Sequence, residues 1–308
     1  MKRPFVIALL FGASLSVARA DVAAAAVPLT SWRGWSREPA LVIPLFLFAA
    51  LYGSGLKWLR RATRSPHKLR RAARCFTAGW LALVAALLSP LHAMGGELFA
   101  AHMVQHELLV ALAAPLVVLG RPWVVLPWAL PRPSRHGLWR AVRRIRFRVP
   151  WLAHDFAAWI AHAAALWLWH VPALFQATLR SDALHALQHL SFLGTALWFW
   201  QAVFHGRHRH AGYGAGVFYL FTTAVHTTVL GALITFAGRA WYSPPGQIAM
   251  RWNLTPLEDQ QLGGLIMWVP AGLAYVIAAL VLFAKWLRET DRPTPLPLAS
   301  ANPPATAP

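Results

Sequence analysis

The sequence predicts an all-α integral membrane protein, a bundle of seven transmembrane helices. The composition is 57% hydrophobic and only 13% charged, whereas soluble domains average roughly 45–50% apolar and about 25% charged residues. In addition, a series of apolar stretches approach or exceed the roughly 20 residues that a helix needs to cross the hydrocarbon core. These stretches cover residues 39–59, 75–95, 98–119, 154–174, 183–204, 214–236 and 262–285.

The N-terminal stretch MKRPFVIALLFGASLSVARA has a basic start, a short apolar run and an A-x-A site before Asp21. This pattern is typical of a cleavable signal peptide, and the apolar run is short for a span. We therefore expect residues 1–20 to be a signal peptide and residues 21–38 to be a short periplasmic segment. Residues 39–287 would form the transmembrane domain. Residues 288–308, rich in Pro, Ala and Thr, would form a disordered cytoplasmic tail.

Loop charges predict the orientation of these helices. Of the 29 Lys and Arg residues, 21 fall on one side of the predicted bundle and five on the other, with three in the leader. Cytoplasmic loops carry the excess of positive charge, so the mature N-terminus is expected outside and the C-terminus in the cytoplasm. Attraction to the anionic inner leaflet accounts for the basicity, and the arginine-rich loops lack the aromatic interleaving of a nucleic-acid site. The bilayer, and no nucleic acid, is the expected partner of these loops.

With that orientation, a set of histidines falls close to the outer boundary of the bilayer, at the outer ends of the second to fifth spans. Ionisable side chains are costly inside spans and normally face an interior or water-filled site. We therefore expect these histidines to share a functional site. They are His92, His102, His106, His170, His185 and His189.

Four of these histidines belong to a repeated pattern, H-x-x-Q-H. It occurs as HMVQH at residues 102–106 and as HALQH at residues 185–189, with Gln105 and Gln188 in the same place. Residues four apart lie on one face of a helix, so each pair of histidines presents a common face. The pattern suggests two helical hairpins related as a weak repeat, with the two pairs facing each other.

The donor set favours a metal. Imidazole, thioether and carboxylate groups without thiolate suit copper or zinc, and the thioethers of Met103 and Met267 favour Cu(I). The same histidines could instead hold a b-type haem between the third and fifth helices, because bundles build cofactor sites from facing helices. A third hypothesis is a copper permease, for which His162 and His226 would continue the polar path inward. Glu258 and Asp259 are expected beside the same outer surface.

Glu107 follows His106 and points about 100° away from it around the helix. Its carboxylate is equally interpretable as a partner of a histidine, a proton-handling group or a contact between helices. The single Cys75 excludes a disulfide framework and any multi-cysteine metal site within the chain. No nucleophile–base arrangement or phosphate-binding glycine pattern occurs in the sequence, and we expect no enzymatic activity.

The residues resemble a family in several segments spread from about residue 40 to 287. The segments are SPLHAMGGELFAAHMVQHELL, APLVVLGRP, LWLWHVPALFQATLR, LHALQHLSFLGTALWFW and TPLEDQQLGGLIMWVPAGLAY. In order and detail they are similar to the bacterial multi-pass cytochrome c oxidase assembly factors, the CtaG proteins associated with caa-type oxidases. An unrelated single-span copper chaperone of the same name uses a cysteine motif that this chain lacks.

The resemblance implies a multi-pass protein of the bacterial plasma membrane that supports maturation of haem-copper oxidase, and we expect it to do so by delivering copper to an oxidase subunit. His102 and His106 match the family's HM-x-x-H motif, and His170 matches WH-x-P. The other matching residues are His185 and His189, in H-x-x-Q-H, and Glu258, Asp259 and Gln260, in LEDQ. Glu107 stands where the family is expected to have an apolar residue.

Overall fold

A computed structural model of the chain describes residues 35–63, 66–149, 154–206, 213–242 and 252–290. The predicted signal peptide and the tail beyond residue 290 lie outside the described residues. In the described part the regular elements are helical, including a π-helical segment, η2, and a 3-10 segment, η3. The elements are α2 (Pro39–Ala62), α3 (Pro66–Leu88), α4 (Pro90–Gly95), α5 (Phe99–Glu107), η2 (Leu108–Ala113), α6 (Ala114–Leu119), α7 (Pro122–Val125), η3 (Leu126–Ala129), α8 (Arg132–Arg148), α9 (Asp155–Trp169), α10 (Pro172–Arg180), α11 (Asp182–His205), α12 (Gly214–Thr235) and α14 (Pro256–Thr290).

All seven predicted spans are helical, but fewer qualify as spans by length and hydropathy. Among the described residues, five helical segments are long and apolar enough to cross a membrane, which marks a multi-pass membrane protein. A sixth span is formed if α9 and α10, bent by 75° at His170, count as one. The remaining helix, α11, has 24 residues but does not pass, because the face that it buries carries polar side chains such as Gln188, His189 and Gln201.

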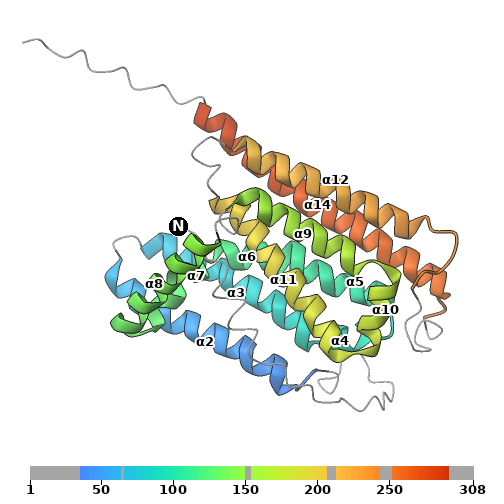
Figure 1. Ribbon diagram of the computed structural model, residues 1–308, viewed down its shortest axis with the longest axis horizontal. Helices are drawn as coiled ribbons and strands as arrows, with labels where there is room; N and C mark the ends of the chain where they lie inside the picture. Colours follow the sequence, from blue (N-terminus) through green and yellow to red (C-terminus); the bar gives the residue numbers. More distant parts are fainter. Residues whose placement is uncertain (1–34, 64–65, 150–153, 207–212, 243–251, 291–308) are drawn as a thin grey trace, which may run out of the picture.

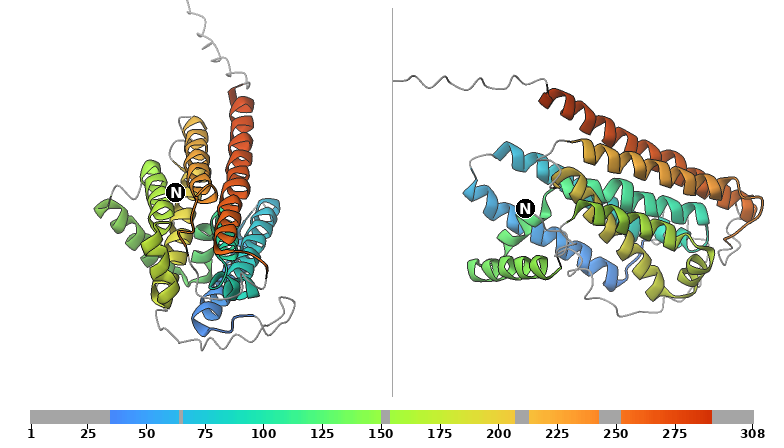
Figure 2. Two further views of the ribbon diagram at one scale, coloured as in Figure 1. Left: turned by 90° about the vertical axis from the view of Figure 1, so that its right-hand side faces the viewer. Right: turned by 45° about the horizontal axis from the view of Figure 1, so that its top comes forward.

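The helices form an elongated bundle (Figure 1). α12 and α14 run side by side along one flank, and α2 lies on the opposite flank in both views (Figure 1, Figure 2). Between them, α11 packs against α6 and α9. α4 and α10 lie at one end of the bundle, and the arginine-rich helix α8 lies at the other.

Two boundaries differ from the predicted spans near the histidines. The second predicted span is two helices: α3 ends at Leu88, and the side chain of Ser89 then accepts a hydrogen bond from the backbone N–H of Leu91 to begin α4. His92 therefore lies on α4. His170 is the C-terminal cap of α9, at the bend before Pro172, whose ring cannot continue a regular helix.

α12 and α14 approach closely through glycines. A Cβ added to Gly264 would lie 2.7 Å from the backbone nitrogen of Thr235 and 2.9 Å from the carbonyl oxygen of Gly231. Small residues permit such close approach of helix backbones inside membranes, where van der Waals packing drives association. Gly231 and Gly264 are therefore packing residues between α12 and α14. This contact fixes the start of α14, which in turn contacts α5.

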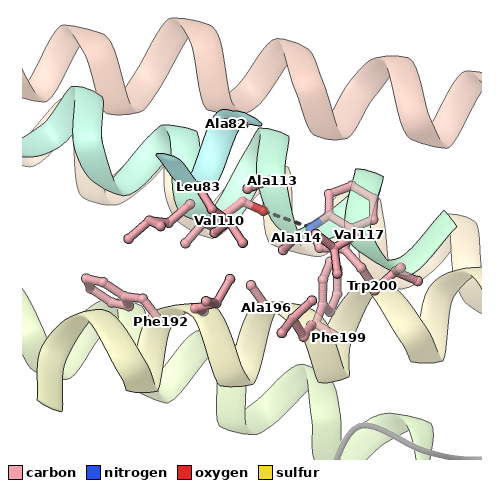
Figure 3. Packing of buried hydrophobic residues seen from close by; sticks show 14 of the residues in the cluster. Ala82, Leu83, Val110, Ala113, Ala114, Val117, Phe192, Ala196, Phe199 and Trp200 are labelled. Atoms are coloured by element: carbon pink, nitrogen blue, oxygen red, sulfur yellow. Dashed lines mark hydrogen bonds between the residues drawn. The ribbon is translucent and has the colours of Figure 1, made fainter. Parts of the chain in front are cut away.

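A π-helical segment interrupts the third span directly after His106 and Glu107. In the π pattern each carbonyl accepts from the N–H five residues later. The carbonyl of Val110 would need the N–H of Pro115, which proline lacks. The indole N–H of Trp200 on α11 donates to the Val110 oxygen instead, at 3.0 Å. Around this bond, apolar side chains of η2, α6 and α11 fill the space between the helices (Figure 3).

Candidate metal centre

The six predicted histidines gather at one end of the bundle. They come from α4, from the first turns of α5 and α11, and from the bend after α9. The ring centroids of His102 and His106 are 4.3 Å apart, as are those of His185 and His189. The two pairs do face each other, as their sequence pattern predicts: His102 lies 5.3 Å from His185, and His106 lies 5.4 Å from His189.

Three of these histidines have the geometry of a metal site. The ligand nitrogens of His102, His106 and His189 all lie within 4.8 Å of one another, and all three side chains are buried. His170 lies at the edge of this triad, with its ring centroid 6.1 Å from that of His106. His92 stacks on His185 at 5.6 Å, and both side chains are only partly buried. Burial in the cluster therefore decreases from the buried triad to the partly buried pair of His92 and His185.

Backbone carbonyls fix the orientation of two of the rings. Nδ1 of His102 lies 3.0 Å from the carbonyl oxygen of Gly95, and Nδ1 of His170 lies 2.6 Å from that of Leu166. A carbonyl can only accept, so Nδ1 carries the proton in each ring, and Nε2 of the neutral ring bears the lone pair. This is the usual arrangement of a metal-binding histidine, in which the second nitrogen donates to a carbonyl.

Several other buried nitrogens in the cluster lack a hydrogen-bond partner within the described part of the chain. An unpaired buried polar group costs about 1–3 kcal/mol, so a group of them at one place indicates a functional use. They are Nδ1 and Nε2 of His106 and Nε2 of His170, His185 and His189.

The glutamines of the two H-x-x-Q-H patterns perform matching roles. Gln105 on α5 donates through Nε2 to the carbonyl oxygen of Ala86, at 2.8 Å, and lies 2.9 Å from Nδ1 of His92. Oε1 of Gln188 on α11 lies 3.2 Å from Nε2 of His102. Each glutamine thus contacts a histidine of another helix, and both are fully buried.

Aromatic rings separate the cluster from the rest of the bundle. The ring of Phe192, one turn after His189, lies 4.6 Å from that of His106 and 6.0 Å from that of His170. Phe175 on α10 lies 5.0 Å from His102. These rings form an apolar wall against which the imidazoles pack.

Glu107 is partly buried, and its buried Oε2 lacks a hydrogen-bond partner among the described residues. The carboxylate interacts electrostatically with Tyr275 on α14. The hydroxyl of Tyr275 lies 3.3 Å from Nε2 of His162, whose Nδ1 lies 3.3 Å from the hydroxyl oxygen of Thr195. His162 is thus a hydrogen-bonded residue between helices.

The predicted acidic residues lie at helix starts. Asp259 accepts hydrogen bonds from the backbone N–H groups of Phe99, at 2.7 Å, and Ala100, at 2.9 Å, and so caps α5. Glu258 accepts from the backbone N–H of Thr255 at 2.7 Å, while its own N–H donates to the Thr255 hydroxyl oxygen, the reciprocal pair of a capping box.

Gln260 also contacts backbone. Its Oε1 accepts from the N–H groups of Trp241 and Tyr242, at 2.5 and 3.2 Å, and holds the loop after α12. Two methionines predicted as thioether donors, Met103 and Met267, pack in a buried apolar cluster with Phe99 and Tyr242.

His226 lies outside the cluster, in the middle of α12, where its Nδ1 accepts from the indole N–H of Trp167 at 3.4 Å. Sequence reasoning missed the groups that orient the cluster. The carbonyl oxygens of Gly95 and Leu166 could not be predicted from the sequence, because every residue has a backbone carbonyl. Phe192 could have been found, since it lies three residues after His189 on the same helix face.

Comparison with known protein families matches residues 50–289 to the cytochrome c oxidase caa3 assembly factors. Uncharacterised proteins of Mycobacterium bovis and Mycobacterium tuberculosis are each 26% identical over 272 residues, which are 86% of this chain and 40% of theirs. One of Mycobacterium leprae is 25% identical over 274 residues. The chain spans about 40% of the length of these curated relatives. No solved structure matches the chain.

Proposed function

The chain belongs to the cytochrome c oxidase caa3 assembly factor family, and from that membership we propose that it binds copper at its histidine cluster for delivery to the oxidase. The observation that carries the proposal is the buried triad of His102, His106 and His189, whose ligand nitrogens lie within 4.8 Å of one another. Neutral imidazoles suit copper. The role is that of a carrier for a metal cargo, without catalysis, and the recipient is a subunit of the oxidase.

The proposed topology places the cluster at the periplasmic face of the bacterial plasma membrane. Exposed arginines of α8 lie at the opposite end of the bundle, where the positive-inside rule puts the cytoplasm. α11 would then be the seventh span, since its 24 residues extend about 36 Å and its polar face is covered by other helices. A cleavable signal peptide at residues 1–20 agrees with an external N-terminus.

The cluster geometry favours a metal ion over haem. Bis-histidine ligation would put a flat macrocycle between the two rings. Here the rings of His102 and His106 meet edge to face at 4.3 Å, and those of the facing helix lie 5.3–5.9 Å away. The imidazoles themselves fill the region between α5 and α11.

The inner half of the bundle argues against a permease. Beneath the cluster the buried side chains are apolar, including Val110, Ala113, Ala196 and Phe199 (Figure 3). His162 is hydrogen-bonded to its neighbours on both nitrogens. A cation moving inward would therefore lose its ligands at this layer.

The test is metal analysis of the protein purified in detergent after loading with Cu(I). We expect about one copper per chain in the wild type and at least a hundredfold weaker binding in His106→Ala, measured by competition with a chromophoric Cu(I) chelator. His226→Ala is the matched control, because this histidine also lies within a span but outside the cluster. A wild type that retains no copper, or a Soret band in its visible spectrum, would overturn the proposal.

A further inference from the structure

We infer that Gln188 competes with copper for His102 and thereby keeps the cargo exchangeable. This inference rests on the proposed function, because it concerns the same site. It assigns to one residue of the H-x-x-Q-H pattern a control over affinity and release.

The argument begins with the two nitrogens of His102. Nδ1 carries the proton that it donates to the Gly95 carbonyl, at 3.0 Å, so only Nε2 can bind a metal. Nε2 lies 3.2 Å from Oε1 of Gln188. Because both atoms are acceptors, the amide pairs with this nitrogen in its rotated orientation, with the NH₂ group toward the ring. His102 therefore cannot act as a ligand until this contact breaks.

The amide of Gln188 is well placed to return to His102. The side chain is fully buried, and its Nε2 has no hydrogen-bond partner in the described part of the chain. An amide can exchange the positions of its NH₂ group and its oxygen by rotation, so it can donate to the lone pair of the neutral ring. With nothing else to bind, the amide recaptures Nε2 whenever the metal leaves.

The other two histidines of the triad are not held in this way. Neither ring nitrogen of His106 has a hydrogen-bond partner among the described residues, and Nε2 of His189 also lacks one. These two rings are available to a cation from the start, and His102 would complete the site as the third ligand. Loss of His102 to Gln188 would reduce the site to two ligands, which favours transfer to a recipient.

The exchange is a ligand substitution without electron transfer. The hydrogen bond between the Gln188 amide and Nε2 breaks as the bond from Nε2 to Cu(I) forms, and both reverse on release. The protonation of Nδ1 is unchanged throughout, because the Gly95 carbonyl keeps that proton.

The experiment compares Gln188→Leu with Gln105→Leu, its counterpart in the other H-x-x-Q-H pattern. Gln105 contacts His92, which lies outside the triad, so both variants remove a buried amide but only one frees a triad nitrogen. A net hydrogen bond of about 1 kcal/mol corresponds to roughly fivefold in affinity. We therefore expect Gln188→Leu to bind Cu(I) about fivefold more tightly and to release it more slowly to a chelator, with Gln105→Leu unchanged.

Weaker or unchanged Cu(I) binding by a folded Gln188→Leu protein would overturn the inference. Gln188→Ala serves as a second variant if the leucine does not fit, with folding checked by thermal melting of both. A wild type that binds no Cu(I) would instead refute the proposed function, so the two failures are distinguishable.

Discussion

The same two helical segments, α5–η2–α6 and α11, are lined by imidazoles at one end of the bundle and by closely packed apolar side chains a few turns further along. At the first end, buried nitrogens lack hydrogen-bond partners within the described residues. At the second, even the carbonyl of Val110, which Pro115 cannot serve, is satisfied by Trp200. The difference indicates that the apolar layer maintains the fold, while the histidine cluster retains the unsatisfied groups that the proposed copper site requires.

The largest effect on this comparison is expected from Phe199→Ala in the apolar layer. Phe199 is 1% exposed and packs against Trp200, with ring centroids 5.5 Å apart. Truncating a buried Phe costs about 3–5 kcal/mol through lost contacts and a cavity, so the melting temperature should fall by several degrees. The fraction that remains folded should still bind copper. Phe221→Ala, at a 63% exposed position on α12, should leave the melting temperature nearly unchanged.

Loss of copper by folded Phe199→Ala protein would show that the two regions are not separable. Thermal melting and copper content must therefore be measured on the same preparation.

Acid should weaken copper binding at the histidine cluster. Only neutral imidazole binds metal, so protons compete with copper, and affinity is present at neutral pH and lost once the imidazoles are protonated. With three imidazole ligands, we expect Cu(I) binding to weaken as the pH is lowered in steps from neutral to the point at which the triad is protonated. Chelator competition at each step, with folding checked on the same sample, measures this. Binding that does not weaken before the protein itself unfolds in acid would contradict ligation by histidine.

Much of this contrast was predictable from the sequence, because it depends on periodicity. The H-x-x-Q-H spacing places His102 and His106 on one face, and the structure confirms that this face meets His185 and His189. The partners of the LEDQ segment were not predictable, because Asp259 and Gln260 bind backbone groups, which any residue carries.

The polarity of α11 explains why hydropathy alone finds fewer spans than the seven that we predict. A helix surrounded by protein on most sides need not be apolar, and α11 buries Gln188, His189 and Gln201. The π-helical segment also escaped prediction. Its apolar residues read as regular helix, and only the distant Trp200 satisfies the carbonyl that it frees.

Trp200→Phe should have an intermediate effect and tests whether the two regions are coupled. The variant keeps an aromatic ring but leaves the Val110 carbonyl without a donor, at a cost of about 1–3 kcal/mol. Because η2 begins two residues after His106, relaxation of the π-helical segment should also rotate that ring and weaken Cu(I) binding less than tenfold. Trp58→Phe, at a 53% exposed position, is the matched control. If the melting temperature falls but the copper affinity is unchanged, the π-helical segment contributes to stability and does not affect the copper site.

The smallest effect is expected from Asp259→Asn. This variant keeps the size of the side chain and tests whether Asp259 acts only as the cap of α5 or also contributes to the metal site. Asparagine keeps one oxygen, which can accept from only one of the N–H groups of Phe99 and Ala100, and it loses the charge that stabilises a helix N-terminus, at a cost of about 1–2 kcal/mol. Glu258→Gln, in the exposed capping box of α14, should cost less. Copper content should be unchanged in both, because neither carboxylate belongs to the triad. Loss of copper from folded Asp259→Asn protein would instead extend the metal site to α14, because capping alone would lower only the melting temperature.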